Sequence, residues 1–410
     1  MNRVGLAGNA GTSEAATRWH LLDAGGITTR EFAAALDRLV PLVCWQPQFR
    51  WVPFFRMTAS AERLEDPPLD LHAFPLQHGY SRPAVARLSR FAARTAALIE
   101  RHAGADIEAP LICTTPFYAP VAERWKGPVI YYLTDLAAAY EGFDAERVMA
   151  LDRRMCARAA LVCPNSRRLA DYLAGQGCDR QKIAVLPNAT RAASVQRIPA
   201  GPARELPPDL RDLHRPLAGV IGNLAGNLDW ELIEEAIALA PRITWVFVGP
   251  LSMRIACRRQ SAARDRVLKN RARTRFVGPK PYGLLHRYAR AFDAGVMPYR
   301  GIEPTLSGSA TRYYEHLAAC RPMLATRGVD ELTEKEPLLR LVESGAELAE
   351  ALRRLERDGF RDGFEQARWA ASRAETWDCR AQALLDAYEA AAGPAPEDAA
   401  HDLWAAVYRR

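Results

Sequence analysis

The stretch TRYYEHLAACRPMLAT, residues 311–326, places a single carboxylate, Glu315, in a segment with the apolar spacing of a helix. The small, hydroxyl-bearing loop TLSGS comes directly before it. Free N–H groups at a helix start and a Ser-Gly-Ser loop suit an anion, above all a diphosphate. A carboxylate one turn further on is placed to accept hydrogen bonds from hydroxyls such as those of a ribose. We therefore expect Ser307, Gly308 and Ser309 to hold the phosphates of a nucleotide and Glu315 its ribose.

An acidic residue near a helix start also has a simpler explanation. It stabilises the helix through its dipole by about 0.3–1 kcal/mol without any ligand. The stretch alone leaves both interpretations of Glu315 open, and the elements around it must decide between them.

Composition and charge indicate a globular chain of two or three domains. The chain has 410 residues, of which 49% are hydrophobic, and one domain takes about 150 residues. The net charge is +7. This mild excess fits an enzyme with an anionic substrate or a membrane-surface contact better than a dedicated nucleic-acid binder.

The cysteines and the apolar runs bear on the compartment. The eight cysteines are scattered without a C-x-x-C pair, so we expect reduced cysteines and a cytoplasmic protein. The first 20 residues contain no apolar signal core. No uninterrupted apolar stretch is long enough to span a bilayer, so we expect any membrane association to be peripheral, at the inner face of the membrane.

Short apolar runs alternate with helix-period segments along most of the chain, without hairpin signals, which predicts parallel sheets of βα units. Strands are expected at 109–116, 128–135, 161–166, 182–190, 217–223, 243–250, 274–279, 293–299 and 322–326. The predicted fold class is α/β, with two Rossmann-like domains facing across a cleft. The expected parts are a first domain at 1–195, a proline-rich linker at 196–216, a second domain at 217–375, and helices at 376–410 that pack back on the first domain. The glycine run GLAGNAG, residues 5–11, fits a turn after a first strand, although few residues precede it.

Three further residues follow strands of the second half. Ligands in open parallel sheets bind beyond the carboxyl ends of the strands. Gly222 and Asn223 end one predicted strand, and Gly278 ends another. Glycines at such ends let the backbone approach a ligand closely, so we assign these residues to the nucleotide site.

The order of the motifs resembles that of GT-B-fold glycosyltransferases of the family 4 or group 1 type, which include many bacterial polysaccharide enzymes. The second half carries the resemblance in FVGPKPYGLLHRYARAFDAGVMPYRG and SATRYYEHLAACRPMLAT. The first half carries it in LVCPNSRRLADYL and KIAVLPNA, and RAETWDCRAQALLDAYEA resembles the closing helix. The resemblance spans roughly Pro110 to Ala392. It implies transfer of a sugar from a nucleoside-diphosphate sugar, held by the second domain, to a polysaccharide or polyprenyl-linked acceptor on the first.

The sequence departs from the family pattern in two places. Many retaining members carry two glutamates eight positions apart, whereas Ser307 stands eight positions before Glu315. The family's basic residues that hold the donor diphosphate have no clear equivalent, and Arg312 and Lys280 are the expected substitutes. These departures keep two rivals open, namely a catalytically inactive, transferase-like binding subunit and a sugar-nucleotide epimerase of the same fold.

The acceptor side is expected in the first domain. Asp135 ends a predicted strand, where the resemblance implies a histidine or aspartate facing the cleft. A carboxylate there would act as general base if the reaction inverts, and would position the acceptor or the sugar if it retains. A plain helix N-cap is the alternative. Thr114 and Thr115 are further acceptor-side candidates.

We expect neither a metal nor a cofactor beyond the donor substrate. No D-x-D triplet is present, and the eight histidines are dispersed without metal-ligand spacing. A metal-dependent transferase of the other common fold would need such a triplet to hold its ion. Helix dipoles and basic side chains would carry the leaving-group charge instead.

The segment Arg254–Arg275 holds nine lysines and arginines against Asp265 alone. Such a run is often only a solvated surface. The functional alternative is a surface for anionic lipid headgroups or a polyprenyl-diphosphate acceptor. The run lacks interleaved aromatic residues, so we expect no nucleic-acid partner.

Overall fold

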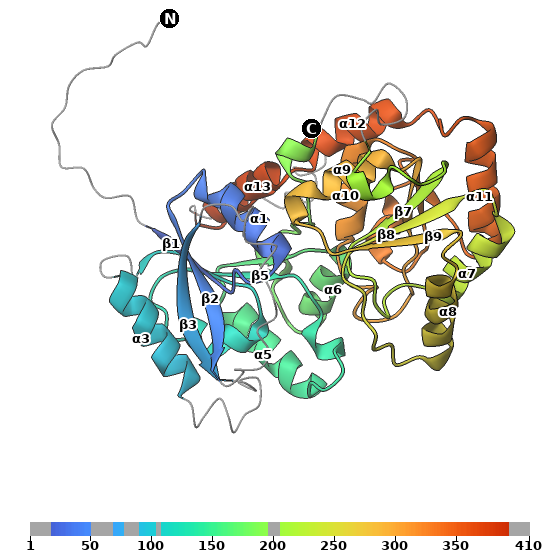
Figure 1. Cartoon of the computed structure of the whole chain (residues 1–410). Coiled ribbons are helices and arrows are strands. Elements are labelled where there is room, and N and C mark those ends of the chain that lie inside the picture. The colour runs from blue at the N-terminus through green and yellow to red at the C-terminus, as the bar shows by residue number, and fades with distance from the viewer. Residues whose placement is uncertain (1–17, 51–68, 78–89, 104–107, 196–205, 393–410) are drawn as a thin grey trace, which may run out of the picture.

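The computed structural model describes residues 18–50, 69–77, 90–103, 108–195 and 206–392. Within these ranges the chain forms two six-stranded sheets, each at the centre of its own domain (Figure 1). All neighbouring strands run parallel. This arrangement confirms the predicted α/β fold with two Rossmann-like domains. The glycine run at residues 5–11 lies outside the described residues.

The first sheet contains, in spatial order, β3 (Asp70–Gln77), β2 (Leu42–Arg50), β1 (Trp19–Leu22), β4 (Leu111–Cys113), β5 (Val129–Leu133) and β6 (Leu161–Pro164). The strand expected at 182–190 does not form. Only an isolated bridge joins Ile183 to Val162, and the chain then turns toward the second domain, where Asn188 makes its hydrogen bonds.

Helices cover both faces of the first sheet. They are α1 (Ile27–Asp37), α3 (Phe91–Ala103), α4 (Ala119–Ala122), α5 (Ala145–Arg158) and α6 (Arg167–Gly175). Alternate residues of β4 enter different cores, since Ile112 packs in the cluster that includes α1 whereas Leu111 and Cys113 pack in the cluster that includes α5. Burial on both faces explains why this strand is an uninterrupted apolar run.

The second sheet contains, in spatial order, β12 (Arg340–Leu341), β11 (Met323–Ala325), β10 (Ala294–Met297), β7 (Leu217–Ile221), β8 (Thr244–Val248) and β9 (Thr274–Gly278). Its helices are α7 (Trp230–Leu239), α8 (Arg258–Lys269), α9 (Leu285–Ala291), α10 (Thr311–Ala319), α11 (Gly345–Arg357) and α12 (Glu365–Ala374). The core on one face is rich in stacked aromatic rings, including Trp230, Phe247 and Phe276. In both sheets the order reverses direction beside the first strand of the domain, which is where open α/β sheets bind ligands.

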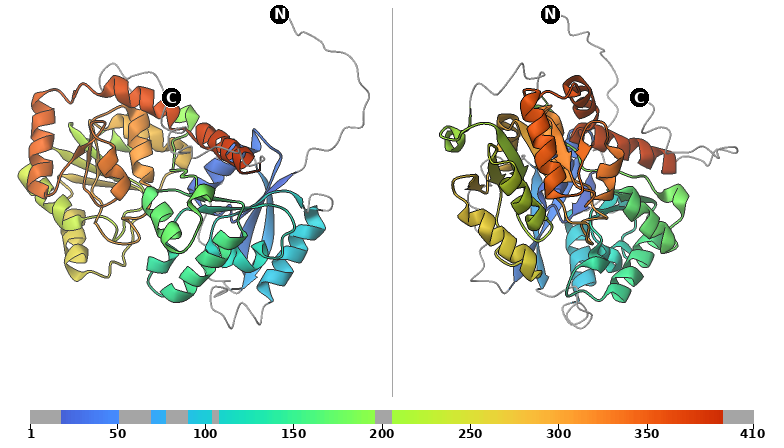
Figure 2. Two further views of the ribbon diagram at one scale, coloured as in Figure 1. Left: turned by 180° about the vertical axis from the view of Figure 1, so that it is seen from behind. Right: turned by 90° about the vertical axis from the view of Figure 1, so that its right-hand side faces the viewer.

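The last described helix, α13 (Trp377–Ala392), returns to the first domain and packs on α1. Figure 2 shows it, in red, lying against the blue first helix. Backbone hydrogen bonds guide its entry, because the Thr190 N–H donates to the Glu375 carbonyl and the Trp377 N–H donates to the Thr190 carbonyl. Trp377 and Leu384 are buried in the same core as residues of α1. The chain therefore crosses between the domains twice.

Substitution of Leu384 by Ala should destabilise the protein by about 2–5 kcal/mol, because it removes a buried side chain and leaves a cavity where α13 meets the first domain. Urea unfolding measures the change. Leu239→Ala is the matched control, since Leu239 is 42% exposed and its loss should cost less than about 0.5 kcal/mol. Equal stability of the two variants would show that α13 is not anchored in that core.

Candidate active site

A cavity of about 600 Å³ lies between the two domains. The second domain contributes the carboxyl ends of β7 and β10, the loop before α10 and the start of α10 itself. The first domain contributes Ile27 and Thr28 from the start of α1, and Asp135 and Tyr140 from the turn after β5. The cavity thus occupies the place where ligands bind in facing α/β sheets.

Seven of the residues predicted from the sequence line this cavity: Asp135, Gly222, Asn223, Gly308, Ser309, Arg312 and Glu315. Five others do not: Thr114, Thr115, Gly278, Lys280 and Ser307. The structure shows what most of these five do instead.

Local contacts occupy the predicted residues that lie outside the cavity lining. Lys280 pairs with Asp209 at 2.7 Å, and this hydrogen bond raises the pKa of Lys280. The Thr114 hydroxyl donates to the Leu22 carbonyl at 3.0 Å. Thr115 accepts a hydrogen bond from a backbone N–H at the start of the turn 116–118. The geometry therefore does not bring Lys280 or the two threonines to the cavity.

Glu315 is the most unusual residue in the lining. It is 3% exposed, and its Oε1 has no hydrogen-bond partner among the described residues. Burial raises the pKa of Glu315 to about 7. The Glu31 carboxylate also raises this pKa, whereas the neighbouring Tyr282 hydroxyl and Arg191 lower it. An unpartnered buried carboxyl is costly, and a ligand hydroxyl would supply the missing partner.

The helix-dipole explanation of Glu315 does not fit its position. Helix α10 begins at Thr311 with Ala310 as N-cap, and its first turn contains no acidic residue. Glu315 lies beyond the turn in which a charge interacts strongly with the dipole. A gain of about 0.3–1 kcal/mol would not offset the burial of an unpaired carboxylate.

Arg312 is committed to the backbone of β7. Its Nε donates to the Ile221 carbonyl and its Nη2 to the Asn223 carbonyl. The guanidinium also lies over the Tyr299 ring, 4.7 Å from the ring centroid. Its charge borders the cavity, but these hydrogen bonds hold it in place. Arg312 therefore positions the turn at Gly222 and is not a free cation that could wrap around a diphosphate.

The loop before α10 is closed by its own hydrogen bonds. The amides of Ser307 and Gly308 each donate to the carbonyl three residues earlier, at 3.2 Å. The Ser307 hydroxyl donates to the Glu303 carboxylate at 2.5 Å. Among the described residues, the backbone amides of Ser309 and Arg312 have no hydrogen-bond acceptor. The donors available to an anion thus lie one to four residues further along the chain than Gly308.

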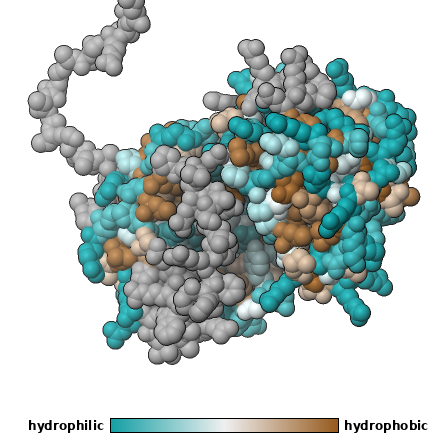
Figure 3. Space-filling model, in the orientation of Figure 1, coloured by the Kyte–Doolittle hydropathy of each residue, from teal (hydrophilic) through white to brown (hydrophobic). Residues whose placement is uncertain are grey.

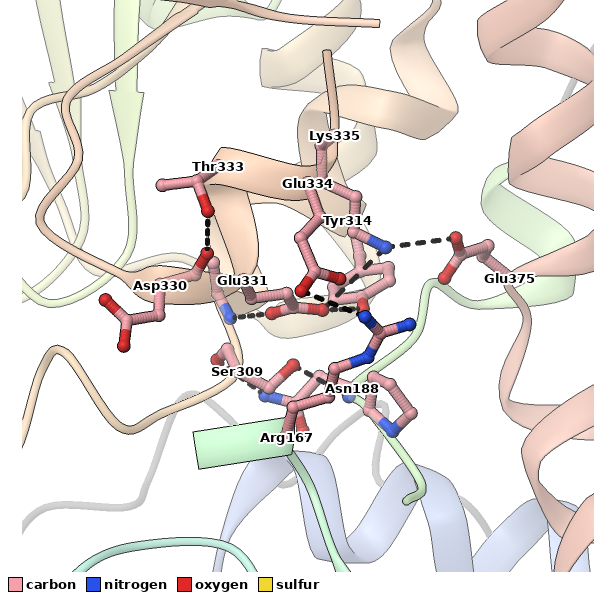
Figure 4. Close-up of polar contacts among 12 residues, drawn as sticks. Arg167, Asn188, Ser309, Tyr314, Asp330, Glu331, Thr333, Glu334, Lys335 and Glu375 are labelled. Carbon is pink, nitrogen blue, oxygen red and sulfur yellow. Dashed lines mark hydrogen bonds and ion pairs between the residues drawn. The ribbon is translucent and has the colours of Figure 1, made fainter. Parts of the chain in front are cut away.

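The first domain holds this loop from the opposite side of the cleft (Figure 4). The Asn188 amide nitrogen donates to the Ser309 carbonyl at 2.9 Å and to the Thr311 hydroxyl at 3.0 Å. The Asn188 backbone N–H donates to the Ser309 hydroxyl at 2.9 Å. Ser166, which caps α6, donates to the Ser307 carbonyl at 2.5 Å. The loop is therefore shaped by both domains.

Ion pairs from the start of α6 reinforce this contact. Arg168 lies 2.7 Å from Glu303 and 2.6 Å from Asp330, and Arg167 lies 3.1 Å from Glu334. Exposed pairs of this kind contribute little individually. Together they fix which face of α6 meets the loop.

The turn at 330–334 supports the start of α10 from behind. The Glu331 carboxylate accepts from the Ala310 N–H at 2.7 Å and from the Tyr314 hydroxyl, which Figure 4 shows beside it. Lys335 next to it pairs with Glu375 at 3.3 Å. The Ala310 amide is thereby satisfied within the protein, which leaves the later amides of the helix start for a ligand.

Asp135 faces the cavity from the first domain. Asp135 is an exposed residue of the cavity lining, and desolvation raises the pKa of its carboxyl. Hydrogen bonds from Tyr140, at 3.1 Å, and Thr134, at 3.4 Å, oppose that shift. The turn that follows, 137–139, has Leu136 as its N-cap and no side-chain cap. Asp135 is therefore not a helix cap.

Sequence reasoning missed several cavity residues. Tyr140, Tyr282 and Glu303 all line the cavity. Tyr282 stands in the quoted segment GPKPYGLL, and its position after a strand end was a usable signal. Glu303 and Tyr140 lie in irregular turns, and their approach to the cavity depends on how those turns fold.

Comparisons with known proteins agree with this architecture. Residues 24–189 match the family model of a glycosyl transferase 4-like domain. No curated protein sequence matches the chain significantly. Among solved structures, HepE from Anabaena in complex with UDP and glucose superposes with a TM-score of 0.61 at 15% identity, over 90% of this chain and 98% of that one.

Two further solved structures are similar over most of the chain. Sucrose-phosphate synthase from Thermosynechococcus elongatus has a TM-score of 0.64 at 15% identity, over 91% of this chain and 98% of that one. The lipopolysaccharide outer core galactosyltransferase WaaB, in its apo form, has a TM-score of 0.58 at 10% identity, over 90% of this chain and 98% of that one. The fold is therefore that of the GT-B glycosyltransferases, and the resemblance seen in the sequence is confirmed.

The raised pKa of Glu315 predicts a specific pH dependence of stability. The carboxyl has a usual pKa of 4.5 and a folded-state pKa of about 7, so the folded state binds its proton more tightly. The destabilising contribution is absent below pH 4.5 and complete above pH 7. Between about pH 4 and pH 8, wild type should lose about 3 kcal/mol relative to Glu315→Gln. Urea unfolding across that range measures the difference, and parallel curves for the two proteins would contradict a buried, unpaired carboxyl.

Proposed function

We propose that the protein transfers a sugar from a nucleoside-diphosphate sugar to a saccharide or lipid-linked saccharide acceptor. The observation that carries the proposal is the buried Glu315 carboxyl, unpartnered at Oε1, in the wall of a cavity shared by two Rossmann-like domains. The complex of HepE with UDP and glucose makes UDP-sugars the first donors to test. WaaB, a lipopolysaccharide galactosyltransferase, supports an acceptor of the cell-envelope or exopolysaccharide kind.

The geometry of α10 supports a position for the donor. In our proposal the ribose hydroxyls donate to Glu315, and the diphosphate lies against the amides of Ser309 and Arg312 at the helix start. The positive end of the helix dipole favours an anion there. Gly222 and Asn223 offer backbone on the opposite wall. This arrangement needs no metal ion, since dipoles and the nearby Arg312 charge would stabilise the leaving group.

The cavity residues of the first domain support a position for the acceptor. Asp135 has a raised pKa, which makes its carboxylate a better base toward an acceptor hydroxyl. Tyr140 donates to that carboxylate and fixes its direction. We propose Asp135 as the general base of an inverting transfer.

The mouth of the cavity is apolar enough to receive part of a lipid-linked acceptor. Ile27, Tyr140 and Ile302 line the cavity and are 48%, 41% and 38% exposed. Figure 3 shows hydrophobic side chains, in brown, gathered on the second domain beside the boundary between the domains. A purely hydrophilic oligosaccharide would not need these contacts, so we favour an acceptor with an apolar portion.

A second candidate function is nucleotide binding without transfer. The charged residues in the cavity lining are Asp135, Glu303, Glu315 and Arg312. The single arginine donates to backbone carbonyls, so no mobile cation lines the described cavity. A binding subunit of this kind would retain the ribose contact and release no product.

Asp135→Asn should lower turnover by about 10²–10⁴ while leaving donor affinity and melting temperature nearly unchanged, because it removes basicity and preserves size. Acceptor-dependent release of nucleoside diphosphate from UDP-, GDP- and ADP-sugars measures turnover. Asp144→Asn is the control, since Asp144 caps α5 and does not line the cavity. Full activity of Asp135→Asn would exclude Asp135 as the general base. A retaining reaction would then be the remaining interpretation of the transfer. Nucleotide binding by wild type without any release would support the binding subunit instead.

The basic segment supports a membrane contact through only some of its residues. Arg264 is 2% exposed and donates to the carbonyls of Ser252 and Met253, and Arg266 pairs with Glu234. Arg264 is thus a structural residue rather than a surface cation, which corrects the interpretation of the whole run as one basic surface. The arginines 254, 258 and 259 are exposed beside Met253, which is 66% exposed.

We propose that these three arginines bind anionic headgroups at the cytoplasmic face of a membrane. None of the described helices is long and apolar enough to cross a bilayer. Electrostatic attraction of this kind weakens as salt rises, because charges are screened over about 8 Å at physiological ionic strength.

Replacement of Arg254, Arg258 and Arg259 by Glu should abolish binding to anionic vesicles, because it reverses the charge of the proposed contact surface. Vesicle co-sedimentation at low and high salt measures the binding. The matched control carries the same charge change at three other exposed arginines, 101, 340 and 361, and should retain most binding. Equal vesicle binding by the two variants would show that only the net charge matters and would contradict a specific contact surface at these three arginines.

A further inference from the structure

Three side chains with metal-binding chemistry meet at the outer edge of the first domain. Asp70 and His72 lie two residues apart at the start of β3, so they project from the same face of the strand. His102 lies in the last turn of α3, which contacts β3. One ligand atom from each residue lies within 4.8 Å of the others. Figure 1 places β3 and α3 on the side of the first domain away from the second domain.

This cluster corrects the expectation that the histidines are dispersed. Within the sequence, the end of β3, the segment 78–89 and most of α3 separate His72 from His102. No short spacing motif connects them, and the packing of α3 on the edge strand brings them together. The expectation of a metal-free transfer reaction concerns the cavity and is unaffected.

The contacts within the cluster are close. His72 Nε2 lies 2.6 Å from an Asp70 carboxylate oxygen, and the imidazole rings of His72 and His102 have centroids 4.0 Å apart. His102 Nε2 is buried and has no hydrogen-bond partner among the described residues. The Trp45 ring lies 5.5 Å from His72 and 5.3 Å from His102, centroid to centroid, so a buried aromatic wall holds both imidazoles in place.

An ordinary Asp–His ion pair does not account for this arrangement. Such a pair would use Asp70 and His72 and would leave His102 beside a second imidazole with a buried, unsatisfied nitrogen, which is costly. The unpartnered ring nitrogen of His102 is instead of the kind that binds transition metals.

We propose that Asp70, His72 and His102 bind one divalent transition-metal ion, with Zn²⁺ as the preferred occupant. Two imidazoles and one carboxylate form a common zinc ligand set, with water in the fourth position. Tetrahedral zinc at about 2.0–2.1 Å from its ligands places ligand atoms about 3.4 Å apart. In the cluster, the Asp70 and His72 ligand atoms are 2.6 Å apart, and no two ligand atoms are more than 4.8 Å apart. The expected spacing lies between these two values. The ion would replace the hydrogen bond between Asp70 and His72.

The surroundings of the cluster would allow such an ion to enter and to connect two elements of the first domain. The side chains of His72 and Asp70 are 33% and 49% exposed, which leaves room for a water ligand and an entry path. The ion would join the edge strand β3 to the end of α3. Metal binding would thus stabilise the outer part of the first domain, independently of transfer in the cavity.

The test uses the full-length protein, freed of metal by a chelator and titrated with zinc chloride in a calorimeter. Wild type should bind one zinc ion per chain, and its melting temperature should rise by a few degrees. His72→Ala and His102→Ala should each bind at least tenfold more weakly, and His214→Ala, which removes an exposed histidine elsewhere, should bind like wild type. Magnesium chloride should give no response, because Mg²⁺ prefers an all-oxygen octahedron.

Cobalt(II) gives a second measurement that does not depend on stability. Wild type and His214→Ala should show the intense visible absorption of four-coordinate cobalt, and the two cluster variants should lose it. If a histidine variant fails to fold by circular dichroism, Asp70→Asn takes its place, since it keeps a hydrogen bond to His72 and removes the anionic ligand. Absence of stoichiometric zinc binding by wild type, or equal binding by the cluster variants and His214→Ala, would overturn the proposal.

Discussion

The hydrogen bonds of the Arg312 guanidinium hold the cleft in its shape. They connect α10 to the carbonyls on either side of Gly222, at the end of β7. Gly222 has φ +103°, and a Cβ there would lie 3.3 Å from Arg312 Nε. At the end of the next strand, a Cβ on Gly249 would lie 2.0 Å from the Gly222 carbonyl oxygen. Three elements therefore meet where only glycines fit, and backbone rather than side chains forms this wall of the cavity.

This constraint determines how an anionic ligand can be bound. Arg312 gives its hydrogen bonds to the protein, and the other charged residues of the cavity lining are the carboxyls of Asp135, Glu303 and Glu315. The neighbouring His316 adds no positive charge, because burial lowers its pKa to about 3. In the proposed function, recognition of a diphosphate would depend on amide groups and the dipole of α10, which act strongly in a cavity of low polarity. The contacts of Asn188 with Ser309 connect the loop before α10 to the first domain, so the shape of this loop depends on both domains.

The sequence predicted the parts that have strong local patterns. In residues 217–326 the parallel βα units are visible in the sequence as apolar strands bounded by glycines. The strand ends near Gly222 and at Gly278, and helix α10, lie where expected. Glu315 and Asp135 stood out because each is a single carboxylate beside an apolar run, and both line the cavity. The same reasoning could not place Lys280, since its pairing with Asp209 joins segments without any periodic relation.

The remaining features depend on long-range packing. Strands β1 to β3 were not identified, because their segments mix polar, aromatic and proline residues, as in LVCWQPQFR. Without those strands, neither α1 at the cavity nor the approach of His72 to His102 was visible. The burial of Arg264 was hidden for a related reason, since a run of charges does not reveal which member turns inward to cap a loop.

The central claim is that the cavity between the domains holds a nucleoside diphosphate by its ribose and diphosphate. A crystal structure of the protein with UDP tests it most directly. The account predicts ribose hydroxyls within about 2.6–3.2 Å of the Glu315 carboxyl and phosphate oxygens on the amides of Ser309 and Arg312. A nucleotide bound outside the cavity, or bound within it with its ribose away from Glu315, would contradict the account.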